Sequence, residues 1–178
     1  GPVSINEILD RSVVLARHRL ELGNVSLSTD IADGLPEISG DANQLQQCLL
    51  NLMFNAVDAM PEGGRLTLAS ALEGPPQIVV LTVADTGTGI EKEALEHIFE
   101  PFYTTKQEGY GVGLGLSTTY GIIERHGGSI RFDSRPGRTV FTVELPTEPP
   151  AIAPARSPPF SADSCAPAAP ACGGPTAR

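Results

Sequence analysis

Glycines are concentrated in residues 85–116, where they alternate with a carboxylate, hydroxyls and one cation. The first segment reads Asp85-Thr86-Gly87-Thr88-Gly89-Ile90, the second contains Thr104-Thr105-Lys106, and the third is Gly111-Val112-Gly113-Leu114-Gly115-Leu116. Glycine lets the backbone approach a flat ring closely, and successive N–H groups at the start of a helix bind anions. Together these segments predict a nucleotide site built in three pieces.

The hydrophobic periodicity predicts helices interleaved with strands. We expect helices over residues 5–22, 41–60, 91–100 and 113–126, with Asp41 as the N-cap of the second. We expect strands over 25–31, 65–71, 78–84, 129–134 and 139–145, with a short turn–strand segment at 35–40. The last two strands flank Pro136-Gly137 as a hairpin. This order predicts an α/β two-layer sandwich, with helices on one face of a mixed, mainly antiparallel sheet.

Composition divides the chain into three parts. Gly1-Pro2 reads as a cleavage scar, so residues 1–4 are interpreted as a scar or leader and the natural protein is expected to extend further. Residues 5–146 carry the predicted elements. Half of the chain's 16 prolines lie after residue 146, mixed with Ala, Ser and Gly, so 147–178 is expected to be a disordered tail or linker.

The charge and the cysteines limit the possible functions. A net charge of −9 argues against a broad basic surface for nucleic acid or anionic lipid, so any phosphate site must be local. The three cysteines follow no disulfide or zinc spacing, which favours a reducing, cytoplasmic setting. No apolar run reaches the length of a membrane span, so any membrane anchor would lie outside this sequence.

Each polar motif has two interpretations. Asn51 and Asn55 share a face of the helix 41–60, with Asp58 on the same side; these groups either satisfy nearby polar atoms or supply an amide oxygen to Mg²⁺. Asp85 either begins a plain turn or accepts a hydrogen bond from the exocyclic amine of adenine. Lys106 is either a solvated loop cation or a contact to a terminal phosphate.

In this order, with the asparagine helix ahead of them, the motifs resemble the catalytic and ATP-binding domain of bacterial sensor histidine kinases, which has the Bergerat-type nucleotide fold. The resemblance covers residues 5–146. Phe99-Glu100-Pro101-Phe102-Tyr103-Thr104-Thr105-Lys106 is similar to the nitrogen-regulation-type subgroup. The chain departs from the family at Thr88, where proline is frequent, and at Val112, where threonine is frequent.

The resemblance implies a role for each matching position. Asn55 would bind Mg²⁺, Asn51 would lie beside the phosphates, and Asp85 would read adenine, with Thr139 close to the base. Asp58 would be a further ATP-binding residue. Lys106 would contact the terminal phosphate and, with Asn51 and Asn55, form the catalytic set. The remaining ATP-binding positions are Gly87, Gly89, Ile90, Phe102, Thr104, Thr105, Gly111, Val112, Gly113, Leu114, Gly115 and Leu116.

Asn51 also bears on the reaction. Related chaperone and gyrase-type ATPases have Glu at this position as the general base for water, and an amide cannot take a proton at neutral pH. The resemblance therefore implies transfer of the γ-phosphoryl group of ATP to a histidine, with ATP and Mg²⁺ as cofactors.

The acceptor histidine is expected outside this chain. His18, His97 and His126 do not lie in the family's phosphoacceptor motif. The expected partners are therefore the protein's own dimerisation and phosphoacceptor domain and a response regulator receiver domain. The alternatives are a non-catalytic nucleotide-binding regulatory module, a serine kinase of the anti-sigma-factor type and an ATPase.

Overall fold

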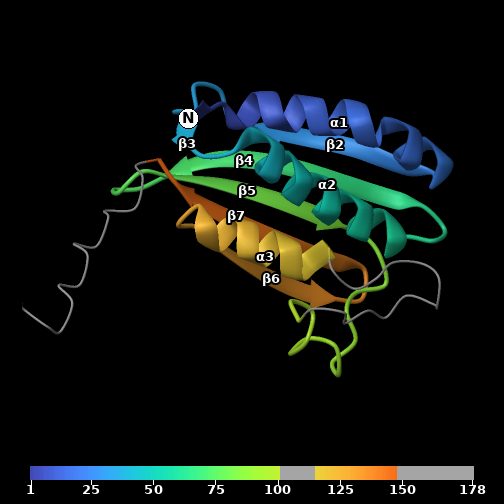
Figure 1. Cartoon of the computed structure of the whole chain (residues 1–178). Coiled ribbons are helices and arrows are strands. Elements are labelled where there is room, and N and C mark those ends of the chain that lie inside the picture. The colour runs from blue at the N-terminus through green and yellow to red at the C-terminus, as the bar shows by residue number, and fades with distance from the viewer. Residues whose placement is uncertain (101–114, 148–178) are drawn as a thin grey trace, which may run out of the picture.

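The computed structural model describes residues 1–100 and 115–147, which form two layers (Figure 1). Helices α1 (Ile5–Leu22), α2 (Ala42–Asp58) and α3 (Gly115–Arg125) cover one face of a five-stranded sheet. The strand order is β2-β4-β5-β7-β6. These strands are β2 (Val25–Ile31), β4 (Gly64–Glu73), β5 (Ile78–Asp85), β6 (Ser129–Arg135) and β7 (Arg138–Pro146). The predicted two-layer α/β sandwich is confirmed.

The helix ends follow local capping chemistry. The side chain of Ser4 accepts a hydrogen bond from the Glu7 N–H at the start of α1, and Asp41 accepts one from Gln44 at the start of α2. At the end of α3, Gly127 has a φ of 73°, and the Gly128 N–H donates to the Ile123 carbonyl at 3.0 Å. This is a Schellman cap, which requires a left-handed residue and so favours glycine.

The helix predicted over residues 91–100 is wrong. This segment is a series of turns, held by hydrogen bonds that span three residues, such as Ala94 to Glu91 and Glu100 to His97. Ala94 and Ile98 are buried, so the turns pack onto the core as a helix would. The apolar residues at a spacing of four thus do not distinguish the two conformations.

The sheet register brings the ends of several strands together at one end of the sheet. β2 runs parallel to β4, whereas the other neighbouring strands are antiparallel. Asp85, at the end of β5, is therefore paired with Leu66 near the start of β4 and with Thr139 near the start of β7. The end of α2 and the start of α3 lie at this same end of the sheet (Figure 1).

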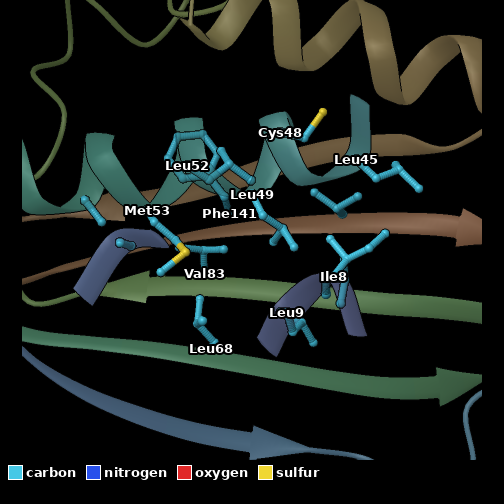
Figure 2. Close-up of a cluster of buried hydrophobic side chains, with 14 of the residues drawn as sticks. Ile8, Leu9, Leu45, Cys48, Leu49, Leu52, Met53, Leu68, Val83 and Phe141 are labelled. Atoms are coloured by element: carbon cyan, nitrogen blue, oxygen red, sulfur yellow. The ribbon is translucent and has the colours of Figure 1, made fainter. Parts of the chain in front are cut away.

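The core between the layers fixes α2 on the sheet. Figure 2 shows Leu49, Leu52 and Met53 of α2 directed toward the sheet residues Val83 and Phe141. All five side chains are buried, and burying a side chain of this size contributes about 1.5–3 kcal/mol. This packing gives the polar residues of α2 a rigid base.

Residues 1–4 contact the fold. Pro2–Val3 forms β1, which pairs with β3 (Ile38–Ser39) in a separate two-stranded sheet, and Val3 is buried. The Gly40 N–H donates to the Gly1 carbonyl at 3.0 Å. The interpretation of these residues as a scar or leader stays a prediction.

Candidate functional site

Asp85 is a buried carboxylate at the end of β5. Its residue is 5% exposed, and its Oδ1 accepts a hydrogen bond from the Gly87 N–H at 2.9 Å. Burial raises the pKa of Asp85 because it disfavours the charged form, while the Gly87 hydrogen bond acts in the opposite direction. The site thus holds a hydrogen-bond acceptor that is fixed in orientation and largely buried from solvent.

The loop after Asp85 is clamped from two sides. A Cβ at Gly87 would collide with the carbonyl of Ala59, at the end of α2. That same carbonyl accepts the Thr88 N–H at 3.0 Å, and the Gly137 N–H donates to the Gly87 carbonyl at 2.8 Å. Gly89 adopts a φ of 82°. Glycine is therefore required at both positions of the predicted adenine loop, at Gly87 by the close Ala59 carbonyl and at Gly89 by its positive φ.

Thr139 and Ile90 are joined to this loop by a residue that the sequence analysis missed. Ser134 of β6 contacts the Thr139 hydroxyl at 2.7 Å and accepts the Ile90 N–H at 2.8 Å. Thr139 is 3% exposed and lies beside Asp85 in the register. An inward-facing polar residue in an alternating strand was the available signal for Ser134.

The two asparagines lie near the start of α3. The Asn51 amide donates to the Gly115 carbonyl at 3.2 Å and to the Thr119 hydroxyl at 3.4 Å. Asn55 is half-buried, one turn further along α2. Its side chain has no hydrogen bond with residues 1–100 or 115–147 in this structure. Thr119, fully buried, is a second supporting residue that the sequence analysis missed.

Asp58 contacts α1, unlike Asn51. Its carboxylate pairs with the Arg19 guanidinium at 2.7 Å, and that guanidinium lies 4.4 Å from the centre of the Phe54 ring. The predicted role of Asp58 beside the nucleotide stays a prediction.

The predicted lid and most of the second glycine array lie outside the described residues. These positions are Phe102, Thr104, Thr105, Lys106, Gly111, Val112, Gly113 and Leu114. Gly115 is the first residue of α3, and Leu116 packs against the hydrophobic core. The Phe99 ring lies 5.4 Å from that of Tyr120 and 5.8 Å from that of Phe132, so the residue that precedes the predicted lid segment packs against α3 and β6.

The three histidines lie outside the motifs that define this site. His126 is a bridge between helices: its Nε2 accepts the Asp41 N–H at 3.0 Å, and its Nδ1 contacts the Ile122 carbonyl at 2.8 Å. The Glu100 carboxylate accepts a hydrogen bond from Nδ1 of protonated His97, and this bond and the negative charge of Glu100 raise the pKa of His97. His18 is exposed on α1.

Two further properties concern metals and membranes. In the part of the chain that the structure describes, no three His, Cys, Asp or Glu side chains gather as a metal site. Over the same ranges, none of the helices combines the length and apolarity that crossing a bilayer demands.

Comparisons with known proteins agree with this geometry. Residues 40–149 match the family described as histidine kinase-, DNA gyrase B-, and HSP90-like ATPase. The sensor kinase CckA of Brucella abortus is 43% identical over 159 residues, which is 79% of this chain and 17% of that protein. This chain thus spans less than a fifth of that relative's length.

Two solved structures are similar as well. The catalytic domain of the histidine kinase ThkA superposes with a TM-score of 0.73 at 33% identity, covering 84% of this chain and 96% of that one. ThkA in complex with the response regulator protein TrrA gives a TM-score of 0.69 at 31% identity, covering 84% of this chain and 42% of that one.

Proposed function

The chain belongs to the histidine kinase-, DNA gyrase B-, and HSP90-like ATPase family and carries the ATP-binding catalytic domain of a sensor histidine kinase, and from this premise we propose that it transfers the γ-phosphoryl group of ATP to a histidine on another domain. The observation that carries the proposal is the buried Asp85, held by Gly87 at the end of the sheet where α2 ends and α3 begins.

We assign adenine recognition to the Asp85 loop. The carboxylate of Asp85 would accept a hydrogen bond from the exocyclic amine of adenine, and Gly87 and Gly89 would let the loop backbone lie against the ring. Ile90 and Thr139, joined through Ser134, would complete the base site. Because the loop is clamped before the nucleotide arrives, little ordering would accompany binding.

We assign phosphate binding to the other two segments. The backbone N–H groups of residues 111–116, which lead into α3, would cradle the phosphates, and Lys106 would contact the terminal phosphate. Asn51 already contacts Gly115, the first residue of α3, and Thr119, one turn further along the helix. Its amide would therefore orient this turn beside the phosphates.

Asn55 fits a magnesium ion that is held mainly by the nucleotide. Mg²⁺ takes oxygen ligands and is usually held by one or two protein groups plus substrate phosphates and waters. The Asn55 side chain makes no hydrogen bond to the residues that the structure describes, so its amide oxygen can serve as such a ligand. When bound, the ion would neutralise charge on the phosphates.

Asn51 favours transfer to another nucleophile over hydrolysis. An amide does not accept a proton at neutral pH, so it cannot activate water. A neutral imidazole needs no such base because it is already nucleophilic. The chain would supply orientation and positive charge through Asn51, Lys106 and the N–H groups before α3.

We propose that the acceptor and the receiver partner lie on other domains. Both ring nitrogens of His126 are engaged in the fold, and none of the three histidines lies in the family's phosphoacceptor motif. Residues 5–146 would form the catalytic domain and 147–178 a tail or linker. The motif from Phe99 to Lys106 favours the nitrogen-regulation-type subgroup. Use of ATP and a response regulator favours a cytoplasmic location.

The proposal is tested by nucleotide binding and phosphate release. ATP titrated calorimetrically into the chain should bind, with affinity reduced in Asn55→Ala only when Mg²⁺ is present. Phosphate release at steady state should be slow, because position 51 carries no base. Absence of ATP binding would refute the proposal, and rapid multiple-turnover hydrolysis would indicate an ATPase instead.

A further inference from the structure

The face of the sheet opposite the helices carries a row of arginines. In the register, Arg65 of β4 and Arg138 of β7 lie on either side of Thr86, which directly follows β5, and Arg135 of β6 is paired with Arg138. The backbone N–H of Arg65 donates a hydrogen bond to the Thr86 hydroxyl at 3.1 Å, so these two residues lie side by side. We call Arg65, Arg138 and Arg135 the arginine row.

A pocket of about 260 Å³ opens between the first two arginines. Its lining includes both arginines and the two threonines, Thr67 and Thr86, with the small Ala84 between them. The remaining lining residues are Asp85 and Gly137. The Asp85 carboxylate accepts the Gly87 N–H, and the Thr86 hydroxyl donates to the Met60 sulfur at 3.6 Å, whereas Thr67 offers a hydroxyl donor. The pocket therefore combines positive charge with the hydrogen-bond donors of the two guanidinium groups and of Thr67.

The arginine row has no ion-pair partner among the described residues, although the chain as a whole is acidic. Arg131, on the same face of the sheet, does pair with Glu144 at 2.7 Å. The carboxylate next to the row is Asp133, which is exposed and is paired with Val140 in the register. No described carboxylate therefore neutralises the positive charge of the row in an ion pair.

We propose that this pocket binds a small phosphate-bearing anion, separately from the nucleotide site. Neighbouring strands lie about 4.8 Å apart, so Arg65 and Arg138, two strands apart, can converge on one phosphate above Thr86. Guanidinium groups match phosphate oxygens with paired hydrogen bonds. Arg135, one strand further, suits a second negative charge, so a diphosphate fits the row better than a single phosphate.

The proposed pocket and the adenine site share the end of one strand but open on opposite faces. Successive side chains in a strand point to opposite faces, so the buried Asp85 side chain lies on the helix face, whereas Ala84 of β5 and its register partner Thr67 of β4 lie on the open face. The anion site therefore does not need any residue that we assign to nucleotide binding, other than the border that Asp85 contributes.

The test is a titration of inorganic pyrophosphate into the full chain saturated with ADP, at constant ionic strength, followed by amide NMR. We expect saturable shifts at Arg65, Thr86 and Arg138. The double variant R65Q/R138Q should bind pyrophosphate about 100-fold more weakly, since each hydrogen-bonded charge contributes roughly a factor of ten or more. The matched control R131Q should bind within about twofold of the wild type.

Three results would overturn the proposal. The first is the absence of saturable shifts, and the second is equal pyrophosphate affinity of R65Q/R138Q and the wild type. The third is an acidic peptide, such as oligo-glutamate, that binds the row more tightly than pyrophosphate, which would indicate a protein partner. ADP affinity measured on R65Q/R138Q should be unchanged, so the result is independent of the kinase assignment.

Discussion

Replacing Asp85 with asparagine should weaken nucleotide binding strongly while leaving the fold intact. The carboxylate is the proposed acceptor for the adenine amine, and a hydrogen bond to a charged group contributes about 1.5–3 kcal/mol. Since about 1.4 kcal/mol corresponds to a factor of ten, ATP affinity should fall by roughly 10- to 100-fold. An amide has only one acceptor oxygen, and Gly87 already donates to the group at this position.

The same substitution should not destabilise the free protein. Burial disfavours the ionised carboxylate and raises the pKa of Asp85, whereas a neutral amide of the same shape avoids that cost and can still accept the Gly87 N–H. We therefore expect the free energy of unfolding of D85N at pH 7 to equal or exceed that of the wild type.

The free energy of unfolding should depend on pH through Asp85. The pKa of Asp85 is higher in the folded than in the unfolded protein, so the folded state binds more protons between the two values. The stabilisation from protonated Asp85 is fully present below the unfolded pKa and is lost as pH rises through the folded pKa. In D85N this loss of stability above the ordinary value of 3.8 should disappear.

Calorimetric ATP titration and urea unfolding from pH 4 to pH 8 measure both effects. The exposed carboxylate of Asp10 supplies a matched control, since D10N should change neither quantity appreciably. Unchanged ATP affinity in D85N would refute the role in adenine recognition. A loss of about 2 kcal/mol or more in stability would show that the carboxylate's hydrogen bonding outweighs its desolvation.

Three further substitutions or reactions test other parts of the account. Gly87→Ala should cost about 1–3 kcal/mol of stability and abolish ATP binding, because the added Cβ would collide with the Ala59 carbonyl at the end of α2. The control Gly121→Ala lies within α3, where the added Cβ makes only ordinary contacts. In thermal unfolding this control should be neutral or stabilising by up to about 1 kcal/mol. His126→Ala should cost about 2 kcal/mol in urea unfolding, since it removes the acceptor of the Asp41 N–H and one of the two partners of the Ile122 carbonyl. A cost below about 0.5 kcal/mol would contradict the bridge. Burial raises the pKa of Cys48 to about 12, so mass spectrometry should find this thiol unalkylated at pH 8 until the chain unfolds, and rapid alkylation of the folded chain would contradict this.

Local patterns in the sequence were enough to predict most of the elements. α1 covers residues 5–22 as predicted, because its apolar spacing is regular and Ser4 and Gly23 mark its ends. The error at residues 91–100 has a physical cause. Ala94 and Ile98 are buried at a helical spacing, yet the backbone bonds span three residues, and the apolar pattern alone cannot separate these cases.

The site depends on contacts between residues distant in sequence, and these were only partly predictable. Asp85 and its glycines formed a recognisable motif, but the register that places Thr139 beside Asp85 arises from strand pairing across 54 positions. Ser134 joins the two halves of the base site through its hydroxyl, and only the folded sheet brings it there. Asp58 pairs with Arg19, a contact that helix spacing alone did not predict, and its place beside the nucleotide stays a prediction.

Phosphoryl transfer to a histidine is the central claim, and one measurement addresses it directly. The chain would be mixed with the dimerisation and phosphoacceptor domain of its own protein and with ATP labelled at the γ-phosphate. We expect acid-labile label on that domain, none on this chain alone, and a strong reduction with D85N. Tight ATP binding by the chain without any label on the acceptor domain would contradict the account.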